Sequence, residues 1–155
     1  MSVLENRIAI ITGSSSGIGA GVAEAFVTEG ATVIINYPDE SELQNAQNTL
    51  NKIIHLSPQS QIIQANVSSE DEVISMINEI NSIHGTIDIL VNNAGIATSA
   101  PVHEMTSSMW DELISIHLKG TVLCTREVLK IMYKKNYGKI INTASQLAYK
   151  GSAGF

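Results

Sequence analysis

The sequence predicts an α/β protein built on a doubly wound parallel sheet, and three observations support this fold class. Short apolar runs of strand length alternate with helix-like patterns along the 155 residues. Polar, glycine-containing turns follow several of the apolar runs. Hydrophobic residues make up 44% of the chain and charged residues 15%, a composition that suits one globular domain with a sizeable core. Apolar strands that alternate with helices pair in parallel and carry helices on both faces of the sheet.

The first half of the chain supplies three strands and three helices. Apolar runs predict strands at residues 8–12, 31–36 and, more weakly, 61–65. A helix over 17–29 ends near Gly30, and its predicted apolar face contains Ile18, Val22, Ala25 and Phe26. A second, amphipathic helix is marked by Leu43, Ala46, Leu50 and Ile54. Ser69 and Glu72 have capping-box spacing before a third helix, whose apolar face contains Val73, Ile77, Ile80 and His84.

The second half continues the alternation with two further strands and one long helix. The strands are predicted at 87–91 and 139–143. The long helix between them is marked at three- and four-residue steps by Trp110, Leu113, Ile114, His117, Thr121 and Thr125. Right-handed crossovers leave one topology for this order, the dinucleotide-binding Rossmann fold, as a single domain over residues 1–155.

Composition excludes several classes of function. The formal net charge of −6 argues against nucleic acid, which calls for clustered lysine and arginine. The single cysteine, Cys124, rules out an internal disulfide, fits a reducing compartment and is best explained as a buried core residue. Apolar runs fall short of a membrane span, and the histidines lack metal-ligand spacing. We therefore expect a cytoplasmic protein with no metal, membrane or nucleic-acid partner.

The glycine-rich turn at residues 12–19 is the most informative motif. It follows the first predicted strand, reads Thr-Gly-Ser-Ser-Ser-Gly-Ile-Gly, and opens a helix. Backbone N–H groups and the positive end of the helix dipole favour an anion there, and glycines allow a pyrophosphate to approach closely. No Lys-Ser or Lys-Thr pair follows the glycines, which argues against an ATP-type phosphate loop.

Two further segments are expected beside this turn. Residues 92–95 follow the fourth strand, and residues 143–151 follow the fifth. Parallel strands bring their carboxyl ends to one edge, and ligands bind there at the point where the strand order reverses. Each segment alone could be a simple turn, but three at successive strand ends favour a shared site.

These residues resemble the short-chain dehydrogenase/reductase family over essentially the whole chain. The family pattern T-G-x-x-x-G-I-G is matched by Thr12, Gly13, Gly17, Ile18 and Gly19. The pattern N-N-A-G is matched at residues 92–95, and the strand ending at Ser145 looks like the one that carries the family's active-site serine. The chain is similar to 3-oxoacyl-carrier-protein reductases and glucose dehydrogenases of this family.

The resemblance implies an NAD(P)-dependent oxidoreductase that interconverts an alcohol and a ketone by hydride transfer. A serine holds the substrate oxygen, while a tyrosine with a nearby lysine acts as general acid or base. The implied cofactor-binding residues are Gly13, Ser15, Gly17, Ile18, Gly19, Asn92, Ala94 and Gly95. Ser145 is the implied catalytic serine. Without the resemblance, it would be read as a turn or helix-capping residue.

One departure from the family concerns the catalytic tyrosine and lysine. The family places Y-x-x-x-K with its tyrosine thirteen residues after the serine, and this chain ends at Phe155. Tyr149 and Lys150 are adjacent, so they cannot replace a pair that shares one helix face at i and i+4. We expect the chain to be a C-terminally incomplete family member, with five strands, that stops before the last strands, and the rest to exist beyond Phe155.

A second departure is His117, where many family members carry an asparagine that supports a proton-relaying water. Histidine can also donate or accept a hydrogen bond, which makes His117 a second catalytic candidate. A buried helix histidine bonded to a backbone carbonyl is an equal alternative.

The choice between NAD and NADP rests on a third departure. Asn36 stands where NAD enzymes of the family carry aspartate, and its neutral side chain tolerates a 2′-phosphate, although no arginine or lysine is nearby. Asn36-Tyr37 resembles NADP-using relatives, so NADP is slightly preferred and NAD stays open. Asn66 and Val67 replace the family's Asp-Val beside the adenine, where the Asn66 carbonyl could accept the adenine amino group.

Two classes of function stay open on the sequence. The first is the oxidoreductase, acting on a small-molecule alcohol or ketone that the sequence does not identify. The second is a catalytically silent dinucleotide-binding module or inactive fragment, because the Tyr-x-x-x-Lys pair is absent from the chain. The resemblance also implies a homo-oligomer, a dimer or tetramer, with the helix around Trp110 to Met132 in its interface.

Overall fold

The computed structural model describes residues 2–152 and contains one five-stranded parallel sheet. The strand order is β3-β2-β1-β4-β5, which confirms the predicted doubly wound arrangement. The strands are β1 (Ile8–Ile11), β2 (Thr32–Tyr37), β3 (Gln61–Gln64), β4 (Ile89–Asn92) and β5 (Lys139–Asn142). The predicted domain of residues 1–155 includes residues 1 and 153–155, which lie outside the described part.

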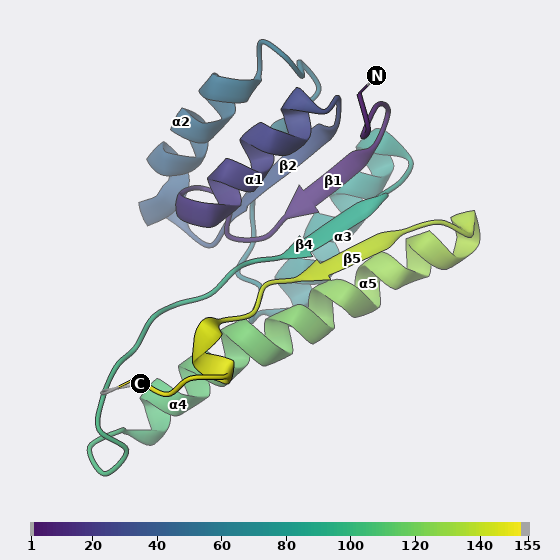
Figure 1. Cartoon of the computed structure of the whole chain (residues 1–155). Coiled ribbons are helices and arrows are strands. Elements are labelled where there is room, and N and C mark those ends of the chain that lie inside the picture. Colours follow the sequence, from purple (N-terminus) through teal and green to yellow (C-terminus); the bar gives the residue numbers. More distant parts are fainter. Residues whose placement is uncertain (1, 153–155) are drawn as a thin grey trace.

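The helices cover the two faces of the sheet (Figure 1). α1 (Gly17–Thr28) and α2 (Leu43–Ile53) pack on one face, whereas α3 (Glu70–His84) and α5 (Gly120–Lys135) pack on the other. A shorter helix, α4 (Ser107–Ile114), precedes α5 along the chain. The strand order reverses at β1 and β4, because β2 and β3 lie on one side of this pair and β5 lies on the other. Since β1 and β4 are parallel neighbours, the turns after these two strands lie next to each other. In such a sheet a ligand binds between these two turns, beyond the carboxyl ends of the strands.

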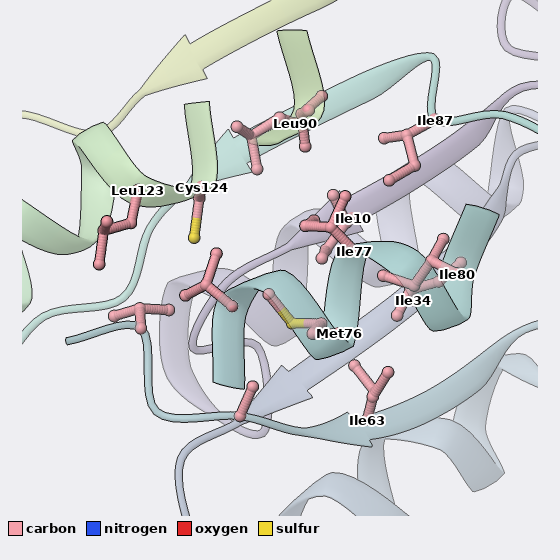
Figure 2. Close-up of a cluster of buried hydrophobic side chains, with 14 of the residues drawn as sticks. Ile10, Ile34, Ile63, Met76, Ile77, Ile80, Ile87, Leu90, Leu123 and Cys124 are labelled. Atoms are coloured by element: carbon pink, nitrogen blue, oxygen red, sulfur yellow. The ribbon is translucent and has the colours of Figure 1, made fainter. Parts of the chain in front are cut away.

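Successive side chains of each strand point to opposite faces of the sheet, which explains why there are two hydrophobic cores. In β1, Ala9 and Ile11 pack against α1 and α2, while Ile8 and Ile10 face α3 and α5. Figure 2 shows the second core, where strand residues such as Ile10, Ile34 and Leu90 meet side chains from α3 and α5. Residues from central strands are buried on both faces, which explains why these strands are continuously apolar in sequence.

The predicted apolar face of α1 is only partly correct, because Val22 and Phe26 are partly buried against the core but Ile18 and Ala25 are exposed. The buried residues are Gly19, Ala20, Ala23 and Val27, whereas Ile18 is 73% exposed. The small residues on the buried face let the helix lie close against the sheet. Ile18 is thereby turned out of the core, at the start of the helix beside the glycine turn.

The predicted capping box at the start of α3 does not form. Ser69 is the N-cap residue, but its side chain makes no capping hydrogen bond. Glu72 instead accepts from the backbone N–H of Asn66 at 2.9 Å. The same glutamate therefore connects the loop after β3 to α3. The predicted capping box is wrong because Glu72 bonds to Asn66, which lies three residues before the predicted partner Ser69.

The long helix predicted from Trp110 to Met132 is divided. α4 passes into a π-helical turn over Ser115–Lys119 before α5 begins at Gly120. The Thr121 hydroxyl donates to the carbonyl of His117 at 2.8 Å within this wider turn. Such π turns occur often at functional sites, and this one contains the predicted candidate His117.

Cys124 lies in the α5 core and is fully buried. Burial raises the pKa of its thiol to about 12, which leaves very little reactive thiolate near neutral pH. We therefore expect a thiol reagent such as DTNB to label the native protein at least ~100-fold more slowly than the urea-unfolded protein. Comparable labelling rates before and after unfolding would contradict this burial.

Within residues 2–152, none of the helices combines the length and apolarity that crossing a bilayer requires. The same described residues contain no cluster of three histidine, cysteine or acidic side chains arranged to hold a metal ion.

Candidate functional site

The glycine turn after β1 adopts a backbone that only its glycines accommodate easily. Gly13 and Gly17 have φ angles of 59° and 58°, in the left-handed region that side chains with a Cβ rarely adopt. The N-cap residue of α1, Ser16, makes no side-chain capping bond. The first N–H groups of α1 are therefore left to an external acceptor, and the helix dipole favours an anion there.

Close backbone contacts explain two of the glycines. A Cβ on Gly13 would lie 2.8 Å from the Cα of Ala94. A Cβ on Gly19 would lie 2.6 Å from both the Gly13 carbonyl oxygen and Asn93 Nδ2, and 2.7 Å from the Cα of Ser14. These distances are too short for any side chain, so the turn packs directly on itself and on the segment after β4.

Thr12 and Asn93 bind the two segments together. The Thr12 hydroxyl oxygen accepts from the backbone N–H groups of Asn93 and Ala94, each at 3.0 Å. The Asn93 amide donates back to the carbonyls of Thr12 and Gly13, at 3.0 and 3.1 Å. The glycine turn and the segment after β4 therefore lie side by side, as predicted, and hydrogen bonds hold them together.

Asn36 and Ser14 join the same turn to β2. The Asn36 side chain, 1% exposed, accepts from the Gly13 N–H at 3.1 Å and donates to the Ala65 carbonyl at 2.9 Å. The buried Ser14 hydroxyl donates to the Ile11 carbonyl at 2.7 Å and accepts from the Asn36 N–H at 3.2 Å. The side-chain oxygen of Asn36 thus supports the glycine turn, and its nitrogen binds the segment after β3.

A cavity of about 550 Å³ opens between these segments. It is lined by most of the predicted cofactor residues, namely Gly13, Ser15, Ile18, Asn36, Asn66, Val67, Ala94 and Gly95. Further lining residues that the sequence interpretation did not name as ligands are Ser16, Pro38, Asp39, Glu42, Ala65, Asn93, Ile96, Glu112 and Ile116. The cavity extends from the end of β2 across the glycine turn to the segment after β4.

Three predicted cofactor residues stand outside the lining of this cavity. Gly17 and Gly19 shape the turn instead of facing the cavity. Asn92 is buried and donates to Thr125 Oγ1 at 3.1 Å and to Asn142 Oδ1 at 2.9 Å. It therefore braces β4 against β5 and α5.

Asn66 uses its side-chain oxygen locally. Its Oδ1 accepts from the N–H and the hydroxyl of Ser68, at 3.0 and 2.7 Å. Both lone pairs of the oxygen that was expected to face an adenine are engaged in this turn. The neighbouring Val67 is buried and contacts the edge of Gly120, where a Cβ would lie 2.8 Å from Val67 Cγ2.

His117 lies against the loop that follows β4. Its ring leaves no room for a side chain at Gly95, where a Cβ would lie 2.4 Å from His117 Cε1. Nε2 lies 3.1 Å from the Ile96 nitrogen and 2.9 Å from the Ile96 oxygen. One ring nitrogen either donates or accepts, so it satisfies only one of these groups at a time. The carbonyl contact of the alternative raised by the sequence is thus present, but His117 is exposed rather than buried.

Ser145 caps a short 3₁₀ turn at Gln146–Ala148. Its oxygen accepts from the Leu147 N–H at 3.1 Å, and its side chain is exposed near the carboxyl end of β5. This is the capping role that the residue would have without any family resemblance. Because the bond uses only the oxygen, the hydroxyl proton is left to donate elsewhere. Tyr149, in the following loop, is 94% exposed.

Glu42 is the main polar residue of the cavity that sequence reasoning missed. It lies in a 3₁₀ turn at Glu40–Glu42 between β2 and α2, and its Oε2 accepts from the Ser15 hydroxyl at 2.6 Å. A signal existed, since an acidic residue about 20 residues after a glycine motif often contacts the ribose in this fold class. Glu40 and Asp39 offered the same spacing, so the sequence alone did not single out Glu42.

Comparisons with known proteins point to one family. A family model described as short chain dehydrogenase matches residues 7–155. The 3-oxoacyl-[acyl-carrier-protein] reductase FabG of Staphylococcus epidermidis is 37% identical over 96% of this chain and 60% of its own length. The corresponding reductase of Synechocystis sp. is 36% identical over 99% of this chain and 62% of its own length. The chain therefore spans about three-fifths of the length of these relatives.

Solved structures share the same fold. A putative short-chain alcohol dehydrogenase from Sinorhizobium meliloti 1021 has a TM-score of 0.91 at 29% identity, covering 97% of this chain and 59% of that one. An NAD+-bound xylitol dehydrogenase gives 0.89 at 26% identity, covering 98% and 58%. A metagenomic short-chain oxidoreductase in complex with NADP gives 0.88 at 30% identity, covering 97% and 67%.

Proposed function

Because the chain belongs to the short-chain dehydrogenase family, we propose that it forms the cofactor-binding part of an oxidoreductase that interconverts an alcohol and a ketone. The observation that carries the proposal is the cavity between the glycine turn and the segment after β4. Its residues fit a nicotinamide dinucleotide, since Gly13 and Gly19 have no room for side chains and α1 presents open N–H groups.

Each part of the cavity has a chemistry that suits part of such a ligand. The start of α1 would hold the pyrophosphate, with the exposed Ile18 beside it. Ala65 and Val67 would pack against the adenine, and Ala94 to Ile96 would line the path toward the nicotinamide. NAD(P), when bound, supplies or accepts the hydride of the reaction.

Ser145 would position the substrate at the carboxyl end of β5. Its oxygen is fixed by the Leu147 N–H, which directs the hydroxyl proton away from that turn. The hydroxyl can therefore donate to the oxygen of a ketone or accept from that of an alcohol. The general acid or base is not among the residues that the structure places near Ser145, since Tyr149 projects into solvent.

His117 would hold the loop beside the nicotinamide and support the predicted relay of protons. In a full-length enzyme that carries the expected tyrosine and lysine, we expect His117→Ala to lower kcat by about tenfold, because Ile96 loses its partner and the loop after β4 is no longer fixed. His117→Asn should keep kcat within about threefold, since one amide can accept from the Ile96 N–H and donate to its carbonyl.

The pH profile of kcat separates the two roles of His117. If the histidine takes part in the relay, His117→Asn should alter this profile even where the maximal rate is retained. A His117→Ala variant with unchanged turnover would remove the residue from both roles.

The NADP preference suggested by Asn36 is not settled by the relatives, whose structures include one with NAD+ and one with NADP. In the structure the Asn36 amide is committed to Gly13 and Ala65. The choice between the cofactors therefore depends on other residues that line the end of the cavity near β2.

We also propose a homo-oligomer, whose contact face lies on α4, the π-helical turn Ser115–Lys119 and α5. Trp110, Leu118, Val122 and Tyr133 are all more than half exposed there, which is unusual for large apolar side chains. The proposed cytoplasmic location is supported by the single free cysteine.

A combined binding and turnover assay tests the proposed function. Full-length protein, including the tyrosine and lysine expected beyond Phe155, is purified and titrated with NAD+ and NADP+, and reduction of the nicotinamide is followed with a panel of secondary alcohols. The proposal expects binding and alcohol-dependent reduction, the latter falling at least ~100-fold in Ser145→Ala. Binding without turnover of any alcohol or ketone would favour the silent dinucleotide-binding module instead.

A further inference from the structure

Glu42 is held in place beside the glycine turn. Its Oε2 accepts from the Ser15 hydroxyl at 2.6 Å and from Asn45 Nδ2 at 3.2 Å. Ser15 is buried, so this bond directs the carboxylate inward, to the wall of the cavity. Its other oxygen, Oε1, takes part in none of the hydrogen bonds found within residues 2–152. A fixed acceptor is therefore exposed at the end of the cavity near β2.

The charged residues that line the cavity within the described part of the chain are all acidic. Among the lining residues in the described part of the chain, the charged ones are Asp39, Glu42 and Glu112. Hydrogen bonds from the Ser41 hydroxyl and N–H lower the pKa of Asp39, which keeps it ionised at neutral pH.

Two lysines on adjoining surfaces, Lys52 and Lys119, have other partners. Lys52, in the groove between α1 and α2 beside Ser15, pairs with Glu24 at 3.1 Å. Lys119 donates to the Ser68 carbonyl at 2.9 Å. A phosphate at this end of the cavity would thus meet carboxylates with no lysine or arginine along the lining.

From this arrangement we infer that Glu42 makes the site selective for NAD over NADP, with Asp39 as a second negative group on the same rim. The inference rests on the proposed function. A ribose 2′-hydroxyl can donate to the free oxygen of Glu42, whereas a 2′-phosphate carries only acceptors and negative charge. It runs against the NADP preference that Asn36 and Tyr37 suggest in the sequence, because the Asn36 side chain is committed elsewhere.

The test is equilibrium binding of NAD+ and NADP+ to the purified protein and three variants, measured by calorimetry. Glu42→Gln keeps the size of the side chain and its ability to accept from Ser15, but removes the charge. Asp39→Asn likewise removes the charge at the second position and keeps an oxygen that can accept from Ser41. Glu79→Gln is the matched control, since Glu79 is an exposed glutamate of α3 on the opposite face of the sheet.

We expect the unmodified protein to bind NAD+ at least ~10-fold more tightly than NADP+. Glu42→Gln should narrow this ratio by roughly five- to tenfold, chiefly through tighter NADP+ binding, and Asp39→Asn should narrow it less. Glu79→Gln should leave the ratio within about twofold of the unmodified protein.

Two outcomes would overturn the inference alone. One is an unmodified protein that binds NADP+ as tightly as NAD+ or more tightly. The other is a Glu42→Gln variant whose ratio equals that of Glu79→Gln. Failure of the unmodified protein to bind either nucleotide would instead overturn the proposed function, and the inference with it.

Discussion

Replacing Gly19 with alanine is expected to abolish detectable nucleotide binding and to lower the free energy of unfolding by about 1–3 kcal/mol. The new Cβ would lie 2.6 Å from the Gly13 carbonyl oxygen and 2.7 Å from the Cα of Ser14. Because both are backbone atoms, no change of rotamer relieves the clash, and the glycine turn must move. Urea unfolding and a nucleotide titration of the variant measure the two effects.

Gly21 provides the control within the same helix. A Cβ at Gly21 meets no atom within 4 Å, so Gly21→Ala should stabilise the protein by about 0.5–1 kcal/mol through the better helix propensity of alanine. The two substitutions are chemically identical and two residues apart, yet they should change stability in opposite directions. Equal stability of the two variants would contradict the close packing of the glycine turn.

Replacing Asn36 with aspartate should lower the free energy of unfolding by about 2–4 kcal/mol at pH 7. The Asn36 amide donates to the Ala65 carbonyl at 2.9 Å in a site that is 1% exposed. An ionised carboxylate has no proton to donate there and would face the carbonyl oxygen in a dry environment. The loss should be measured by urea unfolding against the unmodified protein.

The loss of unfolding free energy caused by Asn36→Asp should depend on pH. Burial raises the folded-state pKa of an unpaired carboxyl above its unfolded value, and the protonated form can donate to Ala65. The variant should therefore be closest to the unmodified protein below the unfolded pKa and lose stability as pH rises through the folded pKa. A difference that is constant between pH 4 and pH 8 would contradict this reasoning.

Asn66→Asp is the matched control for this substitution. The Asn66 side-chain oxygen only accepts, from the N–H and the hydroxyl of Ser68, and a carboxylate accepts equally well. We expect its effect on stability to stay within about 0.5 kcal/mol at pH 7. A large loss here would mean that added charge, rather than the missing donor, explains the effect at Asn36.

The sheet could be predicted from sequence because its signal is strong and local. The central strands are buried on both faces, so runs such as Ile8 to Ile11 are continuously apolar. The glycine turn could be predicted for the same reason, since the positive φ angles of Gly13 and Gly17 are a local requirement of the turn backbone. Because the strands are parallel, the glycine turn after β1 and the segment 92–95 after β4 were expected at the same edge of the sheet.

What escaped prediction depends on side-chain partners distant in sequence. Glu72 has capping-box spacing, but it accepts from the Asn66 N–H. Periodicity alone placed Ile18 and Ala25 on the buried face of α1, where the structure instead buries Ala20 and Ala23. The π-helical turn at Ser115–Lys119 leaves no periodic signal, since one inserted residue only shifts the pattern. Asn36 was read as a neutral ribose contact because the sequence does not reveal its bonds to Gly13 and Ala65.

The central claim is that the glycine turn and the segment after β4 hold a nicotinamide dinucleotide. Calorimetric titration of the purified protein with NAD+ and NADP+, alongside the Gly19→Ala variant, tests it most directly. The account predicts saturable binding of one nucleotide per chain with a Kd below about 1 mM, lost in Gly19→Ala. Absence of saturable binding by the folded, unmodified protein, or undiminished binding by Gly19→Ala, would contradict it.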